Sequence, residues 1–242
     1  MTEIGVGAFY ECSSLKSIDI PDSVTEIGKG AFCGCSSLES IKVSRNNSVY
    51  KSVDGILYNN KLTSIICFPS KHSNTSFIIP DSVTEIGDGA FGFCRSLKSI
   101  DIPNSVTKIG ELAFDGCSSL ESIVIPDSVT EIGDYAFSGC SSLKSIDIPD
   151  SVTKIGEWAF ARCSSLKSID IPDSVTKIGE WAFIRCSSLK SIDIPNSVTE
   201  IGNGVFCRCS SLESVNVVKN NSVYQSVDGI LYNNKLTSII CF

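Results

Sequence analysis

The feature that most constrains this chain is a repeat of 23 residues, seen most plainly in residues 149–171, PDSVTKIGEWAFARCSSLKSIDI. The same pattern recurs on both sides of this stretch. Six prolines mark its period: Pro80, Pro103, Pro126, Pro149, Pro172 and Pro195. A period of about 20 to 50 residues is typical of a solenoid, in which each repeat contacts only its neighbours. The sequence therefore predicts a stack of coils, with one coil for each repeat.

Eight apolar positions recur in every full repeat, and we expect them to face the inside of the stack. In residues 149–171 they are Val152, Ile155, Ala159, Phe160, Cys163, Leu166, Ile169 and Ile171. One coil is too small to bury such a face alone. Stacking at about 4.8 Å, the spacing of neighbouring strands, would bury these side chains in continuous columns.

Three local patterns predict the path of one coil. Residues 168–171 alternate polar and apolar side chains, as a half-buried strand does, and the proline that follows ends the strand. Residues 152–155 predict a second extended piece, which ends where Gly156 turns the chain. Residues 157–163 have room for about two turns of helix, with Ala159, Phe160 and Cys163 on one face.

The pattern LxxIxIPxSVxxIGxxAFxxCSS resembles the BspA-like class of leucine-rich repeats over nearly the whole chain. The proline after the strand, the Ile-Gly, the Ala-Phe and the Cys recur at that family's spacing. The resemblance implies an α/β repeat solenoid: a right-handed leucine-rich coil with a parallel sheet on one face and short strands, turns and short helices on the other. It also implies a binding role in a cell-surface or secreted protein, such as an adhesin or a host-interaction protein.

One coil departs from the repeat. We interpret residues 1–242 as a single solenoid in which residues 44–79 form a long coil. In this coil Asp54-Gly55 lies between apolar runs, which predicts a β-hairpin. Residues 76–79 align with the strand of the ordinary coils, so we expect the long coil to rejoin the sheet in register.

The long coil has a second, incomplete copy. Residues 220–242 repeat residues 46–68 with a single change, Gln225 for Lys51, so residues 218–242 are interpreted as a truncated copy. The first residues likewise fall inside a repeat. A solenoid without polar caps exposes its core and its strand edge, so we expect the ends of this chain to self-associate end to end.

Charge and composition exclude some partners. The formal charge of −7 and the sequence pI near 4.8 argue against a nucleic-acid or anionic-membrane partner. No segment approaches the roughly 20 apolar residues of a membrane span, which argues against membrane insertion. The first residues show no signal peptide. A surface or secreted location therefore rests on the family resemblance.

Twelve cysteines raise the question of metal or redox chemistry. Eight share one column, which predicts buried, reduced thiols stacked in a line rather than converging on a metal. These are Cys12, Cys35, Cys94, Cys117, Cys140, Cys163, Cys186 and Cys209. The other four are Cys33, Cys67, Cys207 and Cys241. A disulfide Cys33–Cys67, repeated as Cys207–Cys241, is one interpretation, and duplication without a bond is the other.

Catalytic signals are poor. The single histidine, His72, has no nucleophile placed near it by a recognisable motif, so we interpret it as a surface loop residue. Residues 87–92 satisfy GxGxxG, but no βαβ unit surrounds them. The sequence predicts no enzyme, no cofactor and no metal site.

The strand face pairs opposite charges within a coil, such as Lys167 and Asp170, and where Glu replaces Lys the Asp is also replaced. This arrangement suits charge balance along a stack. The alternative is that this face reads a ligand.

The column before the core alanine changes along the chain. It holds Gly7, Gly30, Gly89, Leu112, Tyr135, Trp158, Trp181 and Gly204. A column that accepts glycine is not core, so its aromatic side chains are expected outside, with arginines four residues on. The candidate binding residues are Tyr135, Trp158, Arg162, Trp181, Arg185 and Arg208. They form either a stripe for a partner or a set of rings and arginines that cover one another.

We therefore expect a non-enzymatic domain that binds a macromolecule, either a protein or a glycan. Two other classes stay open. A structural spacer would display a functional module elsewhere in a longer reading frame. An intracellular protein-interaction scaffold would have reduced cysteines and no leader.

Overall fold

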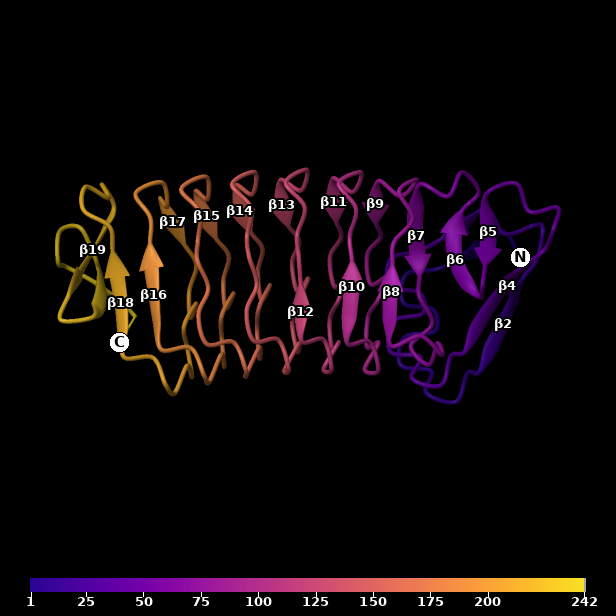
Figure 1. The fold of residues 1–242 in the computed structure, drawn as a ribbon, viewed down its shortest axis with the longest axis horizontal. Helices are drawn as coiled ribbons and strands as arrows, with labels where there is room; N and C mark the ends of the chain where they lie inside the picture. Colours follow the sequence, from indigo (N-terminus) through magenta and orange to yellow (C-terminus); the bar gives the residue numbers. More distant parts are fainter. Residues whose placement is uncertain (242) are drawn as a thin grey trace.

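The computed structural model describes residues 1–241 as an elongated solenoid whose two termini lie at opposite ends of the long axis (Figure 1). Each ordinary coil has three sides: a front strand, a second short strand and a side made of turns. The expected parallel sheet is confirmed, because strands of successive coils pair in parallel with a shift of 23 residues. The expected short helices are wrong, since the described residues contain strands and turns but no helix.

The front strands lie at the positions of the SIDI pattern, as the alternation predicts. They are β2 (Ser17–Ile20), β4 (Ser40–Val43), β8 (Ser76–Ile78), β10 (Ser99–Asp101), β12 (Ser122–Ile123), β16 (Ser191–Ile194) and β18 (Ser214–Val217). In residues 149–171 themselves the ladder is reduced to an isolated bridge at Asp170, although Ile169 and Ile171 remain buried. This gap coincides with a row of successive aspartates, Asp147, Asp170 and Asp193, and like charges in register are unfavourable.

The second strands are two residues long, and each places one isoleucine in the core or, for Ile27 and Ile201, partly buried against it. They are β1 (Glu3–Ile4), β3 (Glu26–Ile27), β9 (Glu85–Ile86), β11 (Lys108–Ile109), β13 (Glu131–Ile132), β14 (Lys154–Ile155), β15 (Lys177–Ile178) and β17 (Glu200–Ile201). Six of these, β9 to β17, belong to one sheet that also takes in β5, β6 and β7 of the long coil.

The turn side does not form a helix because alternate amides bond to the next coil. In residues 157–163, the N–H groups of Trp158, Phe160 and Arg162 donate to carbonyls of the following coil at 2.7–2.9 Å. The amides between them close three-residue turns, as Ala161 N does on Trp158 O at 3.0 Å. An α-helix would use all of these donors within the coil. Stacking therefore replaces the helix that the spacing of apolar residues suggested.

Two columns of side chains dominate the core. Phenylalanine rings stack from Phe68 to Phe206 with centroids 5.1 to 5.8 Å apart. Beside them, each core cysteine from Cys94 to Cys209 donates its S–H to the carbonyl of the phenylalanine 26 residues earlier, at 3.0–3.5 Å. A small side chain with one weak donor suits this narrow column.

The cysteine predictions are mostly confirmed, with one correction. Seven of the eight column cysteines are buried, but Cys12 is exposed because it lies in the first coil of the stack. No disulfide joins the described cysteines, so the Cys33–Cys67 bond is not formed although both side chains are buried. Burial raises the pKa of Cys33 to about 12 and that of Cys163 to about 12, which keeps both thiols protonated.

The long coil contains a three-stranded antiparallel unit, here called the first unit (residues 46–68). Its strands are β5 (Tyr50–Val53), β6 (Ile56–Asn59) and β7 (Ser64–Cys67). The predicted hairpin is confirmed: Asp54 and Gly55 have φ of 51° and 81°, the left-handed pair of a tight hairpin turn. β8 then pairs with β10 in register, as expected.

The first unit divides the core in two. Leu57 packs in a small N-terminal cluster with Ile4 and Phe32, while Ile56 and Tyr58 join the long cluster that continues to the C-terminal coils. The second unit (residues 220–242, described to 241) repeats its strands as β19 (Tyr224–Val227), β20 (Ile230–Asn233) and β21 (Ile239–Cys241).

Candidate binding surface

Backbone conformation explains the glycines of the turn side. The column of Trp158 has φ between 56° and 68° in every coil, whether its residue is a glycine, Leu112, Tyr135 or a tryptophan. The column of Arg162 is also left-handed, with φ of 58° to 78° in the coils that hold Gly34, Phe93 or an arginine. These are left-handed positions, where glycine has no steric cost and larger residues are strained. Glycine recurs in the column of Trp158 because the backbone there has a positive φ in every coil.

The three predicted aromatic residues form one continuous stack. The rings of Tyr135 and Trp158 lie 5.7 Å apart at an interplanar angle of 5°, and those of Trp158 and Trp181 lie 5.7 Å apart at 28°. Tyr135 is 38% exposed, while both tryptophans are half-buried. The stack ends where the ring of Trp181 lies over Gly204, in the space that a Cβ there would fill. The half-buried Leu112 extends the same row by one coil.

The arginines lie beside the rings rather than over them. Arg162, Arg185 and Arg208 have φ of 60°, and all three side chains are exposed. A spacing of four residues would place each guanidinium on a tryptophan only in a helix, and these residues form turns instead. Among the described residues the one cation–π contact is that of Arg95 with Phe93, at 5.6 Å. The three arginines form no ion pair within the described chain, so their donors face solvent.

Acidic residues flank the stack on its other side. The column before the rings holds Asp88, Glu111, Asp134, Glu157 and Glu180 in successive coils. Asp88 and Asp134 also accept the backbone N–H of the next coil's acidic residue at 2.8–2.9 Å, which fixes their carboxylates. Burial raises the pKa of Asp115, while a hydrogen bond from Ser138 and the charge of Arg162 oppose that rise. The surface thus has an acidic row, an aromatic row and an arginine row.

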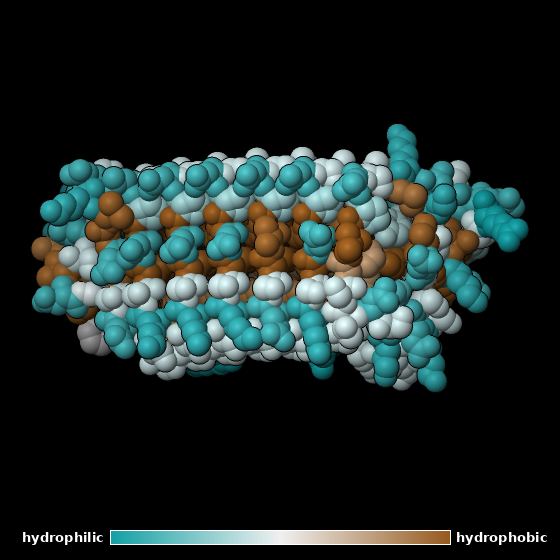
Figure 2. Space-filling model, viewed as in Figure 1, coloured by the Kyte–Doolittle hydropathy of each residue, from teal (hydrophilic) through white to brown (hydrophobic). Residues whose placement is uncertain are grey.

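The front face, which the front strands form, differs from the turn side in having no row of aromatic side chains among the described residues. Rows of polar and apolar side chains run along the long axis there (Figure 2), and most of its exposed positions carry serine, lysine or aspartate. Lys144 forms an ion pair with Glu121 of the previous coil at 2.8 Å. Exposed Val124 and Ile78 interrupt the aspartate row. Exposed ion pairs of this kind contribute little to the free energy of unfolding.

The remaining candidates have structural roles. His72 Nε2 lies 3.1 Å from the carbonyl oxygen of Asp54, its Nδ1 accepts from Asn74 N, and its ring packs 4.8 Å from Phe68. In the GxGxxG stretch, a Cβ on Gly92 would collide with the Cys33 sulfur, so packing explains that glycine. Among residues 1–241 no cluster of His, Cys, Asp or Glu side chains is placed to hold a metal ion.

Sequence reasoning missed one buried polar residue in each unit. Asn47 is buried, donates to the carbonyls of Pro21 and Val24, and accepts from the amides of Val49 and Tyr50 at 2.8–2.9 Å. Asn221 makes the equivalent four bonds in the second unit. The sequence signal for this role was that an asparagine occupies the same position in both units.

Parallel front strands, a phenylalanine ladder and a 23-residue coil define the leucine-rich-repeat class of solenoid. A family model described as "BspA type Leucine rich repeat region" matches residues 2–71, 64–153 and 131–241, in six copies. The chain therefore belongs to the BspA-type leucine-rich repeat family, which confirms the resemblance seen in the sequence. This family is one of repeat scaffolds rather than a catalytic one.

Solved structures agree with this assignment. A leucine-rich repeat protein from Eubacterium ventriosum is 33% identical, with a TM-score of 0.71 over 87% of this chain and 63% of that one. One from Bacteroides ovatus is 31% identical, with a TM-score of 0.57 over 90% of this chain and 59% of that one. The pneumococcal vaccine antigen PcpA, at 23% identity and a TM-score of 0.60, shares the fold over 92% of this chain and 50% of its own.

The chain thus spans less than two thirds of the length of each of these three proteins. A search of curated proteins gave no match. In the part of the chain that the structure describes, no helix is long and apolar enough to cross a membrane.

Proposed function

We propose that this chain is a non-enzymatic binding domain whose ligand, a protein or a glycan, contacts the aromatic and arginine rows of the turn side. The binding surface consists of Tyr135, Trp158, Trp181, Arg162, Arg185 and Arg208. We further propose that the domain acts at a cell surface or outside the cell, as part of an adhesin or host-interaction protein. The family and the description of PcpA as a vaccine antigen support that location.

The observation that carries this proposal is the choice of residue at left-handed positions. Both columns accept glycine in other coils, yet over successive coils they hold tyrosine, tryptophan and arginine, with φ of 56° to 60°. A side chain in this conformation costs about 1–2 kcal/mol relative to ordinary backbone. Strained positions concentrate at functional sites. Tryptophan, tyrosine and arginine are also the residues that dominate binding interfaces.

A binding screen with a matched pair of variants tests the proposal. The wild-type chain is applied to a glycan array and to a panel of immobilised extracellular proteins. The double variant Trp158→Gly, Trp181→Gly removes two rings while keeping residues that the backbone prefers. The control, Lys167→Ala with Asp170→Asn, changes the front face of one of the same coils.

We expect any ligand retained by wild type and by the control to be lost by the double variant. Trp158 and Trp181 are the only tryptophans of the chain, so binding should also change its tryptophan emission. The proposal would be contradicted if wild type, control and double variant bound a ligand equally and the tryptophan emission of wild type did not change on binding. Absence of any ligand in the screen would favour the spacer interpretation instead.

A further inference from the structure

The two tryptophans of the turn side can offer a ligand their edges but not their faces. Trp158 lies between Tyr135 and Trp181, with ring centroids 5.7 Å away on either side. A flat group inserted between two rings would need about 7 Å, which is twice the contact distance of two carbon atoms. The second face of Trp181 lies over Gly204, where a Cβ would have no room. No tryptophan face is therefore left for stacking with a sugar ring or a base.

The exposed edges of the two tryptophans attract electron-rich groups. Neither indole Nε1–H donates to a group within residues 1–241, and neither nitrogen is among the buried polar atoms without a partner, so both reach solvent. The edge of an aromatic ring also carries partial positive charge. Arg162 and Arg185 add two exposed guanidinium groups, which form no ion pair within the described chain. Carboxylates are the groups that guanidinium binds best, through two parallel hydrogen bonds.

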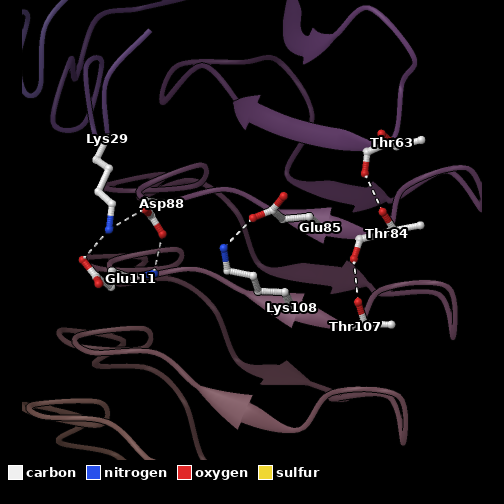
Figure 3. A network of polar contacts seen from close by, with 8 residues as sticks. All are labelled: Lys29, Thr63, Thr84, Glu85, Asp88, Thr107, Lys108 and Glu111. Atoms are coloured by element: carbon white, nitrogen blue, oxygen red, sulfur yellow. Dashed lines mark hydrogen bonds and ion pairs between the residues drawn. The ribbon is translucent and has the colours of Figure 1, made fainter. Parts of the chain in front are cut away.

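The acidic row on the other side of the rings has a cation of its own only in the earlier coils. Lys29 Nζ lies 3.1 Å from Asp88 Oδ2 and 3.3 Å from Glu111 Oε2 (Figure 3). Asp134 and Glu157 follow in the same row, beside the rings, and form no ion pair within residues 1–241. The carboxylates without a cation thus lie in the coils that hold the aromatic side chains.

These carboxylates lie close to the rings, so they act on the same ligand. Burial raises the pKa of the Tyr135 hydroxyl, and the charges of Glu157 and Asp134 add to that rise. A ligand that is negative along its whole length, such as a sulfated glycan, would be repelled by this row. A ligand with carboxylates on one flank and cations on the other satisfies both charged rows.

The spacing of the rows matches one turn of an α-helix. The ring centroids are 5.7 Å apart from coil to coil, and a helix presents side chains on one side about every 5.4 Å, at i, i+4 and i+7. Alternate residues of an extended strand are about 6.7 Å apart. Over three coils a helix departs from the rows by about 1 Å and a strand by about 2 Å. A helix along the solenoid axis therefore places one side chain of each kind over each successive coil.

We propose that the ligand of this surface is an amphipathic α-helix of a partner protein, which lies along the solenoid axis over residues 126–194 of the turn side. Carboxylates one turn apart on one flank of the helix bind Arg162 and Arg185. Its middle places apolar side chains and amide groups against the ring edges, and lysines or arginines on its other flank face Asp134 and Glu157. This inference rests on the proposed function, because it uses the same rows, and it selects a protein rather than a glycan.

A peptide library tests the proposal on the 242-residue chain. Alanine-rich peptides of about 20 residues are long enough to be helical in water. The positions along one side of each peptide vary among Glu, Lys, Leu and Gln, and each bead carries one sequence. The retained peptides should have Glu one turn apart on one flank, Lys on the opposite flank, and Leu or Gln between them. The same peptides with a central proline cannot form the helix and should not be retained.

An exchange of charges then checks the register. Arg185→Glu should weaken the binding of a retained peptide at least about tenfold, and replacing one Glu of that peptide by Lys should restore it. Glu157→Lys should act in the same way on the other flank, with rescue by a Lys to Glu change in the peptide. Arg45→Ala removes an exposed arginine of the long coil and should leave binding unchanged. Circular dichroism checks that each variant is folded.

This inference and the proposed function fail in different ways. The helix is overturned if no peptide is retained, if the retained peptides lack the two charged flanks, or if the charge exchange gives no rescue. It is also overturned if the ligand found in the binding screen is a glycan. In each case the proposed function stands as long as the Trp158→Gly, Trp181→Gly variant loses the screened ligand. Peptides bound equally by wild type and by that double variant would overturn both.

Discussion

The first and second units have almost the same sequence but different surroundings. Both form three antiparallel strands around an Asp-Gly turn, with the same pairing of the first two strands. Ser64 and Ile65 are buried, whereas their equivalents Ser238 and Ile239 are exposed. Since the sequences agree, the coil formed by residues 80–102 makes this difference. Local pairing builds the unit, and its neighbour decides which side chains become core.

The turn side repeats this lesson. At the first junction Cys33 packs against Gly89 and Gly92, and Lys71 N donates to Leu38 O at 2.8 Å. At the second unit the matching place is an open cavity of about 650 Å³, which is lined by Cys207, Arg208 and Ile240 among others. Equivalent residues thus line a packed junction in one place and a hollow in the other.

Thiol labelling should give the largest contrast. Cys33 is buried and Cys207, its equivalent, is exposed. Labelling of a buried thiol requires opening of the fold, so Cys33 should react slower than Cys207 by roughly a thousandfold or more at pH 8. Mass spectrometry after timed labelling at low protein concentration measures both rates. Similar rates would show that the first junction opens freely.

Isoleucine truncation compares the two units directly. Ile65→Ala removes a fully buried side chain and should lower the free energy of unfolding by about 2–5 kcal/mol. Ile239→Ala removes an exposed one and should change it by less than about 0.5 kcal/mol. Urea unfolding measures both variants. Equal losses would contradict the view that the following coil sets burial.

Asparagine truncation examines a feature that the units share. Asn47→Ala and Asn221→Ala each leave buried backbone groups without partners, so each should cost about 1–3 kcal/mol. The two losses should agree, because both asparagines make the same four bonds. A clear difference in thermal unfolding would show that the asparagines, too, depend on the next coil.

Alkaline pH should weaken the first junction through Cys33. Burial raises the pKa of this thiol to about 12, whereas an unfolded thiol has a pKa of about 8.5. The folded state therefore holds the proton longer, and this stabilisation is complete below pH ~8.5 and lost as the pH rises towards 12. The difference in unfolding free energy between wild type and Cys33→Ala should shrink by about 1–2 kcal/mol from pH 8 to pH 10. A constant difference would contradict the assignment.

The single sequence difference between the units should have the smallest effect. Gln225 donates to Asn234 O at 2.7 Å, whereas Lys51 is exposed. Lys51→Gln should allow the same bond to Asn60 O and raise the unfolding free energy by no more than about 0.5 kcal/mol. A larger change would mean that Lys51 has a role the structure does not show.

The repeat predicted everything that depends on register. The columns of Phe160, Cys163 and Ile155 and the two parallel strands follow from spacing, because positions one period apart must stack. The hairpin follows instead from its turn residues, Asp54-Gly55. The helix over residues 157–163 could not be excluded in this way. The spacing of its apolar residues suits a helix. The helix is absent because alternate backbone N–H groups donate to carbonyls of the next coil, and the sequence of one coil does not show these hydrogen bonds.

The sequence predicts the position of the aromatic and arginine rows, but for a reason that differs in part from the one the structure shows. Glycine in the column of Trp158 was interpreted as evidence that the column is outside the core. The backbone there is left-handed in every coil, and glycine in two columns, such as Gly89 and Gly116, was the signal for it. The rings stack as their register predicts. The expected contact between each ring and a guanidinium does not form, because it required a helix that is absent.

The left-handed columns also bear on how such proteins diversify. A position of this kind tolerates glycine or a large side chain, and neither choice disturbs the phenylalanine and cysteine columns behind it. Duplication of a coil therefore copies the core intact, while later substitutions at one or two sites per coil rewrite the outer surface. Core packing and the outer surface are encoded in separate columns, so one can evolve while the other stays fixed.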